Sequence, residues 1–599
     1  MVNCMRVFAT SMLSLVMWLP LFPSLAIAAF ATGTGIARVP NFNSSDEGYG
    51  IALQGDGKIV IAGRCIESGA NPCVARLNAD GTMDSTFNPS GVVPGKRVID
   101  GLTINTSSFL RGVKVLIAAD GKIVVATTCS LANRNYVCAA RLNADGSFDD
   151  GFDGPDPTNP GNGRFRLQIT SSLDEVLSDA ALQRIDGRIV LVGQCGSYHC
   201  LARLKGSDGS YDADSNDFGL LGPSTADRPP ADPAANGRFL YRFPSTFNSA
   251  GVGNGIAVET TNEGKVLIAG TCGTSALELC LTKLNRDGTF DTDFRGDSLP
   301  LGQGGRVRIL TTDESGNAVK QRATDVKIQT DGRFLVQCGY FRTSSWSQCM
   351  YRVNSDGTVA TSFSSGLPFP SEPGRVVYNP IGDALAFAIT PGTGPYANRI
   401  VTLGNCDGVG GNSGGTSCVT ALRNGTVAAS ADGTVDPTLI GPNGDQVGSF
   451  NFRTRGLSVR NNDTREIVAN AEGDFFIVGE CDGQMCVYKF RADGALDTGP
   501  CIADVDGDGN VSAASDGLAI VRSMLGVPAN ASVPPGLGYD IDGDGTLIAS
   551  RDGLLILRRM LGFTGNALIR DIPFATTARR STSSDVESYL RARCRIPLS

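Results

Sequence analysis

One sequence pattern occurs seven times in this chain, and this repetition constrains the fold more than any single residue does. The first copy, residues 50–87, reads GIALQGDGKIVIAGRC, IESGANP, CVARLNADGTMDSTF. Each copy contains three apolar runs, with two cysteines around a variable insert between the second and the third, and Asp-Gly or Glu-Gly pairs beside most runs. The copies recur at roughly 65–75 residues, a period that indicates an array of similar β-sheet modules.

The Asp-Gly pairs predict how each copy folds. They favour tight hairpins, because both central residues of a type I′ turn need positive φ. A fourth apolar run follows a looser connection, as at residues 96–99 and 164–169. We therefore predict a mainly β protein, with residues 29–500 forming a seven-bladed β-propeller of four-stranded blades. The seventh copy lacks its fourth run, and we expect residues 35–39 to complete that blade.

The beginning of the sequence predicts export. Arg6 precedes an apolar run that ends in small residues at positions 26–28, so residues 1–28 are predicted to be a secretory signal peptide. Pro20 and Pro23 argue against a spanning helix, and no other segment is long and apolar enough to cross a bilayer. The net charge of −8, with scattered basic residues, argues against a nucleic-acid partner. We expect a secreted protein, extracellular or periplasmic.

Cysteine usage agrees with export. Cys4 lies in the predicted leader, and the remaining sixteen cysteines form an even set, which is typical of disulfides in an exported chain. A metal site needs about four converging thiolates, whereas here one pair occurs in each copy. The predicted pairs are Cys65–Cys73, Cys129–Cys138, Cys195–Cys200, Cys272–Cys280, Cys338–Cys349, Cys406–Cys418, Cys481–Cys486 and, outside the repeats, Cys501–Cys594.

The repeats resemble the bacterial delta-60 repeat family, whose tandem DGKIVVAG…ARLNxDGxxDxxF segments are expected to form propellers. The resemblance covers residues 35–498 and is strongest in the first two copies. The sixth copy departs from it, because residues 384–389 lead into a Pro-containing turn without Asp-Gly. The resemblance implies a propeller in a bacterial protein and no particular activity.

Features shared by the copies are predicted to be structural, whereas features that occur once are candidates for function. A basic residue recurs before Leu-Asn or its equivalent, and we expect it to pair with the Asp-rich turn of its own blade; it is Arg76, Arg141, Arg203, Lys283, Arg352 or Lys489. His199 is the only histidine, and we expect it at an exposed hairpin tip. Tyr340, Phe341 and Trp346 are a candidate ligand-binding set, suited to stacking on a sugar or anchoring a protein. The alternative is that they fold back over their own blade.

The region after the repeats carries the clearest metal-binding pattern. DVDGDGNVSAASDGLAIVRSMLG, residues 504–526, recurs as DIDGDGTLIASRDGLLILRRMLG, residues 540–562, and each copy ends in an apolar helical pattern. Carboxylates at alternate positions of a loop, with Gly at the sixth, indicate a calcium loop, so we predict two calcium ions. The closing acid comes one residue late in both loops, after Ser515 and Arg551. The predicted ligands are Asp504, Asp506, Asp508, Asn510 and Asp516, and Asp540, Asp542, Asp544, Thr546 and Asp552.

This duplicated loop-helix unit resembles a type I dockerin, an EF-hand-like calcium module. We assign it residues 501–599, including a C-terminal tail helix for which Ser584 and Glu587 have capping-box spacing. Dockerins use a Ser-Thr pair to recognise cohesin. Here Ala513-Ala514 and Ala549-Ser550 occupy those positions, which weighs against cohesin as a partner.

Three classes of function remain. The first is a secreted calcium-binding recognition or adhesion protein, with the propeller as a platform for a glycan or a protein. The second is a polysaccharide hydrolase or lyase that acts through paired carboxylates. The third is a structural component of the cell envelope. Acidic residues at the propeller axis would favour the enzyme, whereas a shallow face carrying Tyr340 and Trp346 would favour binding.

Overall fold

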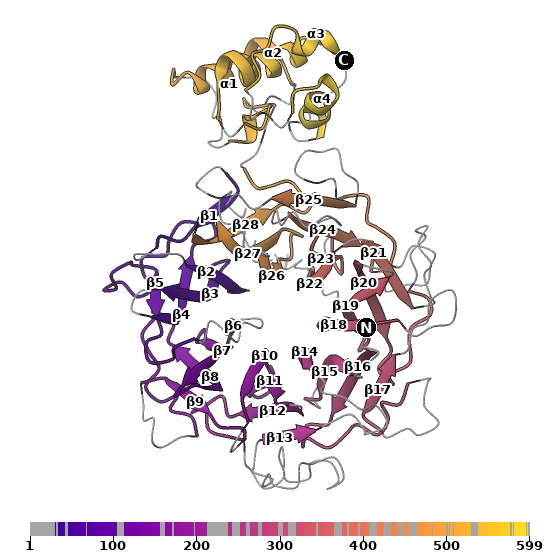
Figure 1. Ribbon diagram of the computed structural model, residues 1–599. Helices are drawn as coiled ribbons and strands as arrows, with labels where there is room; N and C mark the ends of the chain where they lie inside the picture. Colours follow the sequence, from indigo (N-terminus) through magenta and orange to yellow (C-terminus); the bar gives the residue numbers. More distant parts are fainter. Residues whose placement is uncertain are drawn as a thin grey trace, which may run out of the picture.

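The computed structural model shows a ring of β-sheets with a small helical module beside it (Figure 1). The structure describes residues 30, 34–41, 46–66, 69–104, 113–155, 162–170, 173–196, 198–212, 238–241, 252–258, 264–272, 278–296, 304–309, 319–342, 345–363, 374–379, 382–392, 396–406, 416–424, 433–439, 441, 448–453, 464–481, 483–498, 501, 503–506, 508, 510–528, 533, 537–544, 546–575, 578, 580–592, 594 and 596. The predicted signal peptide lies outside them.

Within the described residues, the strands form seven four-stranded antiparallel sheets, which confirms the predicted seven-bladed propeller. The strands nearest the axis (Figure 1) are β2 Glu47–Leu53, β6 Val113–Ile117, β10 Glu175–Leu182, β14 Val252–Val258, β18 Gln321–Ile328, β22 Asp383–Ile389 and β26 Thr464–Ala469. The second strands are β3 Ile59–Ile66, β7 Ile123–Leu131, β11 Ile189–Cys195, β15 Val266–Cys272, β19 Phe334–Arg342, β23 Ile400–Asn405 and β27 Phe475–Cys481.

The third strands each return from a second strand as a hairpin. They are β4 Ala70–Leu77, β8 Arg134–Leu142, β12 Tyr198–Leu204, β16 Glu278–Leu284, β20 Ser345–Val353, β24 Thr416–Leu422 and β28 Gln484–Phe490. The outer strands are β5 Lys96–Val98, β9 Arg164–Leu167, β13 Arg238–Tyr241, β17 Arg306–Ile309, β21 Arg375–Asn379, β25 Ser449–Arg453 and β1 Ile36–Arg38.

The ring closes through its first strand, as the unpaired N-terminal run predicts. Strand β1 lies antiparallel to β28, with Ile36 opposite Tyr488 and Arg38 opposite Cys486. Blade seven is therefore built from β26, β27, β28 and β1. Closure in this way pairs the edge of β28, which would otherwise expose unpaired backbone groups.

The Asp-Gly pairs form turns, but the predicted type I′ geometry is wrong, because Asp56 and Asp80 lack the positive φ that both central residues would need and only the glycine has it. Gly57 and Gly81 have φ values of +83° and +78°, which are accessible to glycine at little cost. In the second turn of blade one, Oδ1 of Asp80 accepts hydrogen bonds from the backbone N–H and the hydroxyl of Thr82, at 3.0 and 2.6 Å. The same Asx contact recurs at Asp145, so these turns belong to the scaffold.

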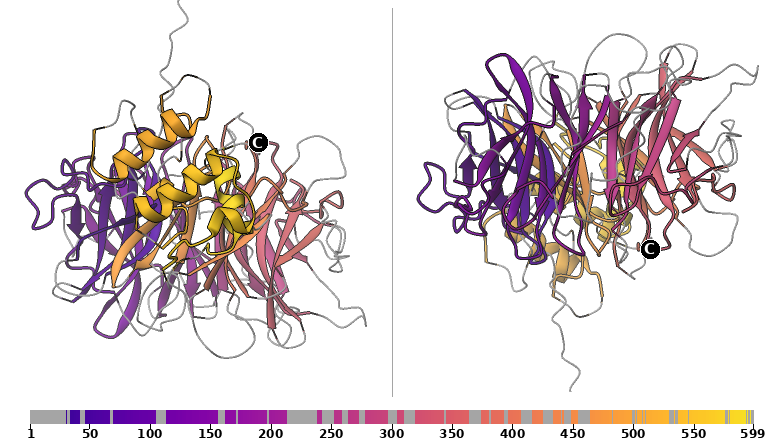
Figure 2. Two further views of the ribbon diagram at one scale, coloured as in Figure 1. Left: turned by 90° about the horizontal axis from the view of Figure 1, so that it is seen from above. Right: turned by 90° about the horizontal axis from the view of Figure 1, so that it is seen from below.

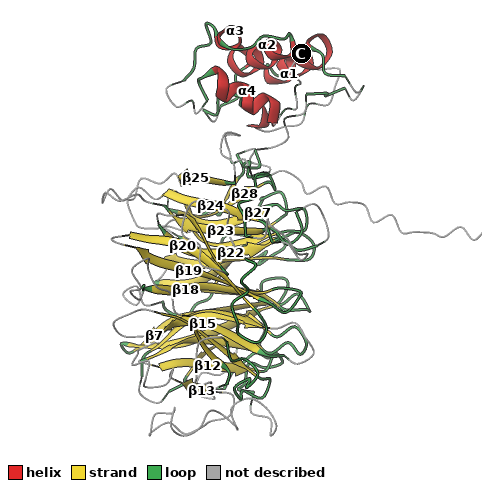
Figure 3. Cartoon of the chain, turned by 90° about the vertical axis from the view of Figure 1, so that its right-hand side faces the viewer, coloured by secondary structure: helices red, strands yellow, loops and turns green. Residues whose placement is uncertain are grey.

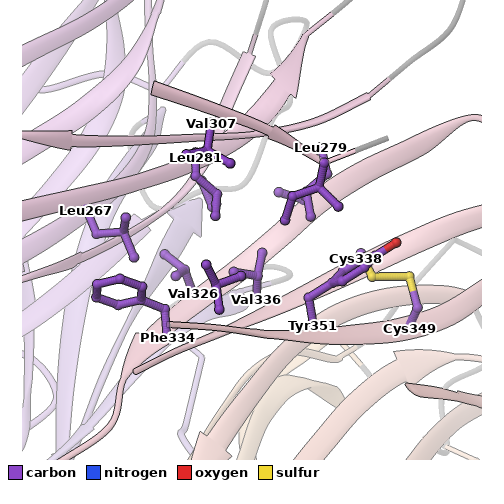
Figure 4. Close-up of a cluster of buried hydrophobic side chains, with 14 of the residues drawn as sticks. Leu267, Leu279, Leu281, Val307, Val326, Phe334, Val336, Cys338, Cys349 and Tyr351 are labelled. Atoms are coloured by element: carbon purple, nitrogen blue, oxygen red, sulfur yellow. A yellow bond between two sulfur atoms is a disulfide. The ribbon is translucent and has the colours of Figure 1, made fainter. Parts of the chain in front are cut away.

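The hydrophobic cores lie between neighbouring blades. In one of them, Leu267, Leu279 and Leu281 of blade four pack against Phe334 and Val336 of blade five, and all are fully buried (Figure 4). Equivalent clusters occur between other blades, so each sheet is apolar on both faces. The ring is held together by sheet-on-sheet burial repeated around the axis.

Disulfides clamp the hairpins between second and third strands. Six of the seven predicted repeat pairs are bonded, with Cα–Cα distances between 4.9 and 5.9 Å. Cys280 is also disulfide-bonded, but the side chain of its predicted partner Cys272 lies outside the described residues. Cys501 and Cys594 are bonded across 93 residues, as predicted. Disulfides at this density are typical of proteins in an oxidising, extracellular compartment.

The C-terminal module lies outside the ring, beside its edge (Figures 2 and 3). It contains η3 Ala513–Gly517, α1 Leu518–Met524, η4 Leu537–Tyr539, η5 Ala549–Gly553, α2 Leu554–Met560, α3 Asn566–Ile569 and α4 Ser583–Ala592. Their apolar faces form one core around Ile520, Leu555, Ile556 and Leu590. In the described part of the chain, no helix is long and apolar enough to cross a membrane.

The tail helix α4 is present, but its cap differs from the prediction. The Thr582 hydroxyl accepts the backbone N–H of Asp585 at 3.2 Å, so Thr582 takes the capping role that the capping-box spacing assigns to Ser584. Glu587, the predicted box partner, instead accepts the N–H of Gly565 at 2.5 Å. The helix begins two residues earlier than that pattern implies, because Thr582 supplies a cap upstream.

Candidate functional site

In five blades the recurrent basic residue forms a buried ion pair with an acid of its own blade, and we call this pair a clasp. The pairing confirms the structural interpretation of these residues. In blade one, Nε of Arg76 donates to Asp84 at 2.7 Å. The matching ion pairs are Arg141–Asp149, Arg203–Asp212, Lys283–Asp291 and Lys489–Asp497, at 2.6 to 3.2 Å. Blade five differs, since Ala360 replaces the acid and Arg352 donates to Gln329 at 3.0 Å. Residues that recur in this way are committed to the scaffold.

The clasps also join neighbouring blades. Nη2 of Arg141 donates to the carbonyl of Ser207 in blade three at 2.6 Å, and Lys283 reaches the carbonyl of Ser355 in blade five at 3.1 Å. Burial raises the pKa of Asp84, but hydrogen bonds from Thr86 and the Arg76 guanidinium outweigh burial and lower that pKa to about 2. The clasp carboxylate of blade one is therefore ionised at neutral pH.

The strands nearest the axis share one register position at which the blades differ. In every blade one residue of the inner strand pairs with the fourth residue of the second strand, and in six blades it follows a β-bulge. We call these residues the axial layer: Gly50, Lys114, Asp179, Gly255, Asp325, Ala386 and Glu466. One position of the blade is thus basic, acidic or without a polar side chain, depending on the blade.

Side chains of the axial layer meet across the centre of the ring. Nζ of Lys114 in blade two lies 3.2 Å from Asp179 in blade three and 2.7 Å from Glu466 in blade seven. Blade one separates blades two and seven along the ring, so this contact is made near the axis. The layer is also narrow, because a Cβ at Gly50 would lie 2.6 Å from the carbonyl oxygen of Val113.

The third acid of the layer has a different environment. Asp325 is 6% exposed, lies 3.1 Å from Nζ of Lys327 and accepts the backbone N–H of Phe387 in blade six at 3.1 Å. Burial raises the pKa of Asp325, and Glu466 and Asp179 raise it further, against the lowering effect of Lys327. Burial lowers the pKa of Lys114, but Asp179 and Glu466 outweigh burial and raise it, so Lys114 stays charged.

Sequence reasoning missed the axial layer. Its residues lie far apart in the chain, and the repeat pattern does not fix the residue type at their position. One signal in the sequence could have revealed it: alignment of the seven copies on the second-strand runs places these residues in one column. That column contains glycine, alanine, lysine and acids, whereas the column that follows it is uniformly apolar.

The three residues of the predicted aromatic set differ in burial. Tyr340 is 7% exposed and belongs to the core between blades four and five, with the Arg375 guanidinium 4.6 Å from its ring centroid. Phe341 and Trp346 face each other across the hairpin of blade five and are only partly buried, with ring centroids 5.3 Å apart. The binding prediction therefore retains Phe341 and Trp346, while Tyr340 supports the hairpin from inside.

His199 does not lie where the sequence analysis expected it. The turn between β11 and β12 is so short that β12 already begins at Tyr198, which places His199 inside a strand. The side chain is 1% exposed, and burial lowers the pKa of this histidine to about 4. The exposed hairpin-tip prediction is wrong, and His199 is a neutral core residue at physiological pH.

The first predicted calcium loop brings three carboxylates together. Oxygens of Asp504, Asp506 and Asp508 lie within 4.8 Å of one another. Calcium–oxygen distances are about 2.3–2.6 Å, so one ion could contact all three, and this loop fits calcium. Asn510, predicted to ligate through its carbonyl, donates its backbone N–H to Asp508 at 2.7 Å.

The acids that come one residue late in the two loops, Asp516 and Asp552, accept hydrogen bonds from the backbone of their own loops. Asp516 accepts N–H groups from Val505 and Ser512, both at 2.8 Å, through different oxygens. Asp552 does the same with Ile541 and Ile548, at 2.7 and 2.8 Å. Each acid sits in a π-helical turn, which accommodates the one-residue shift seen in the sequence. Their role as metal ligands stays a prediction.

The second loop is built alike but contains an internal cation. Oxygens of Asp540, Asp542 and Asp544 also lie within 4.8 Å of one another. However, Nε of Arg551 lies 2.8 Å from Asp542, and its Nη2 pairs with Asp544 and donates to the Thr546 hydroxyl at 2.9 Å. Burial raises the pKa of Asp542 to about 7, with the nearby Asp552 adding to the rise. This loop does not fit calcium while Arg551 keeps its position.

Comparisons with known proteins support the propeller and go no further. A family model described as "Domain of unknown function (DUF5122) beta-propeller" matches residues 54–87 and 118–152. No curated protein matches the chain. The domain match and the seven sheets together identify a propeller-like repeat protein.

Solved propellers resemble the chain only loosely. A polysaccharide lyase of the ulvan lyase family PL25 is 9% identical, with a TM-score of 0.38, and the match covers 77% of this chain and 97% of that one. The Dos1 propeller is 11% identical, with a TM-score of 0.36 and coverages of 76% and 95%. An inactive virginiamycin B lyase from Staphylococcus aureus is 10% identical, with a TM-score of 0.34 and coverages of 76% and 98%. Similarity at this level carries no argument about function.

Proposed function

We propose that this protein is a secreted recognition protein that binds a glycan or a protein partner on its propeller and calcium in its C-terminal module. The observation that carries the binding role is the Phe341–Trp346 pair on the hairpin of blade five. Two partly exposed aromatic rings, inclined at 66° to each other, offer an apolar surface of the kind that contacts sugar rings or anchors a protein partner.

The aromatic pair is held in place before any ligand arrives. The Cys338–Cys349 bond closes the hairpin below it. The Arg322 guanidinium lies 4.4 Å from the Trp346 ring centroid and forms an ion pair with Asp383 of blade six at 2.6 Å. Gly382 of blade six donates its N–H to the carbonyl of Trp346 at 2.8 Å. A rigid aromatic surface loses little conformational entropy on binding, which favours affinity.

The proposed calcium binding rests on the Asp504, Asp506 and Asp508 cluster. When bound, the ion would neutralise carboxylates that otherwise repel one another. The loop residues themselves contribute by holding the backbone through Asp516. Because a loop of this kind is ordered by its ion, calcium binding would be coupled to the folding of this region.

The experiment uses the only tryptophan expected in the mature protein. The chain contains two tryptophans, and Trp18 lies in the predicted signal peptide, so fluorescence reports on Trp346. We expect at least one member of a panel of soluble neutral and acidic polysaccharides to shift its emission. F341A keeps the reporter and should weaken that binding at least tenfold. Y136A, on the hairpin of blade two, is the matched control and should bind as wild type.

Two results would contradict the recognition role. One is a panel, extended to extracellular proteins from the same cells, in which no member changes the fluorescence. The other is unchanged affinity in F341A. A structural component of the envelope would give the first result.

A second function is favoured by the axial layer. Asp325 has a raised pKa, and Lys114 lies within ion-pair distance of the Glu466 and Asp179 carboxylates near the same axis. A carboxyl group with a raised pKa, accompanied by further carboxylates, is the combination that hydrolysis of polysaccharides requires. The same panel should therefore be assayed for new chain ends. If a polysaccharide is cleaved and D325N removes that cleavage while F341A does not, the enzyme replaces the binding platform as the conclusion.

A further inference from the structure

We propose that the Arg551 guanidinium is the built-in cation of the second loop, so that the module takes one calcium ion, in the first loop. The proposal rests on calcium binding by the first loop, put forward above. It differs from what the duplicated sequence predicts, which is one ion in each loop.

The two loops differ at one decisive position. Ser515 and Arg551 occupy the same place, 36 residues apart, where a calcium loop normally carries its closing acid. Both copies have the three alternate aspartates, and both have the aspartate that accepts the loop N–H groups, Asp516 or Asp552. The exchange of a neutral hydroxyl for a guanidinium is the one difference between the two twelve-residue loops that adds a charge.

Arg551 occupies the ligand side of the second loop. Its side chain contacts Asp542, Asp544 and Thr546, three of the five residues predicted to ligate calcium there. A planar guanidinium with several donors suits such a set of oxygens. In the first loop, by contrast, the hydroxyl of Ser515 lies 2.8 Å from that of Ser512 and 3.1 Å from Asp516, and adds no charge.

Burial makes the arginine hard to displace. Arg551 is 6% exposed and Asp542 is fully buried, whereas Asp506 and Asp508 of the first loop are exposed. An entering dication would have to remove a buried cation from its partners or bind next to it. Either arrangement leaves a buried charge poorly compensated, which is costly.

A second arginine closes the same loop from the tail. Nε and Nη2 of Arg580 donate to the carbonyls of Ile541 and Asp540, at 2.6 and 2.7 Å. Its guanidinium stacks 3.9 Å from the ring centroid of Tyr589 in α4. A Cβ at Gly543 would approach Arg580 to 2.8 Å, so this glycine permits the close contact. The second loop is thus covered by Arg580 and contains the positive charge of Arg551.

The consequence is a module with one calcium-dependent half. The loop after Cys501 needs an ion to become ordered, whereas the loop around Arg551 is ordered without one. Calcium would therefore order the first loop, while the second loop, held by Arg551 and Arg580, keeps its order in either state.

The test is the calcium stoichiometry of the full mature chain, measured by isothermal titration calorimetry. We expect one ion for wild type, none for S515R and two for R551S. The two substitutions exchange the residues that distinguish the loops, so each controls for the other. In parallel, hydrogen exchange should show the amides of Ile541 and Ile548 protected in chelator, and those of Val505 and Ser512 protected only with calcium.

The outcomes separate this proposal from the calcium proposal on which it rests. No ion in wild type but one in R551S would refute calcium binding by the first loop and support the blocking role of Arg551. Two ions in wild type, or no gain in R551S, would overturn the proposal. If R551S fails to fold, the exchange data decide: loss of protection at Ile541 and Ile548 on chelation would overturn it.

Discussion

The propeller and the C-terminal module are both built from repeats, but their copies differ in different ways. The blades share turns, clasps and disulfides, and differ at the axial layer and at the hairpin tips. The two loops share their aspartates and helices, and differ chiefly at Ser515 and Arg551. In both regions the shared residues are engaged within the scaffold. Differences between copies therefore point to function more reliably than the repeated pattern does.

The two regions also differ in how they are stabilised. The ring has several hydrophobic clusters between blades, whereas the described part of the module has one. A small core supplies little stability, so such domains depend on disulfides or metal ions. The first prediction tests this dependence.

Removal of the Cys501–Cys594 disulfide should have the largest effect. The bond closes 93 residues, and the chain-entropy model assigns about 4–5 kcal/mol to a loop of this length. C501A/C594A should therefore unfold the module at much lower urea concentration, as followed by helical circular dichroism. The matched variant C195A/C200A opens a separation of only 5 residues in blade three and should cost about 2 kcal/mol. Equal losses of stability in the two variants would contradict the expected dependence on the length of the closed loop.

Removal of a clasp should have a smaller effect that depends on the blade. K489M removes the ammonium group 2.7 Å from Asp497. The residue just before the second strand cannot replace it, because in blade seven this residue is the acid Asp474. We therefore expect the free energy of unfolding to fall by about 3–4 kcal/mol. In R203M, Arg188 stays 2.7 Å from Asp212 and should keep the loss to about 1–2 kcal/mol. Urea unfolding of the ring, followed by tyrosine fluorescence, measures both. A larger loss for R203M would contradict the clasp model.

The last prediction is a dependence of the ring's stability on pH, of the same size as the smaller clasp effect. The pKa of His199 is about 4 in the folded chain and about 6.5 when unfolded, so the unfolded chain binds the extra proton. Stability from this group is complete above pH 6.5 and is lost as the pH falls toward 4. Between about pH 7 and pH 5 the loss should be about 2 kcal/mol.

H199Q provides the control for this effect, because the chain has no other histidine. The difference between wild type and H199Q should change with pH by this amount, while acids that titrate in the same range affect both proteins equally. A difference that stays constant with pH would show that His199 is accessible to protons.

The sequence predicted those parts of the structure that depend on local rules. Asp-Gly turns, periodic apolar runs and the unpaired N-terminal strand led to the number of blades and to the way the ring closes. The burial of His199 and Tyr340 was not predictable, because it depends on tertiary packing that the repeat pattern does not show. The axial layer depends on bulges that set which side chain of β10 or β18 faces the axis. The position of Arg551 depends on how its side chain folds back onto its own loop, which spacing alone does not define.

The pairing of β1 with β28 also affects how the chain must fold. Ile36 and Tyr488 are among the first and last residues of the ring to leave the ribosome, and each needs the other to complete blade seven. Such a contact carries a large loop-closure cost and forms late. Until then, the edge of β28 is open to the strands of other chains. A nascent copy would therefore be most prone to aggregate at its last blade, just before folding is complete.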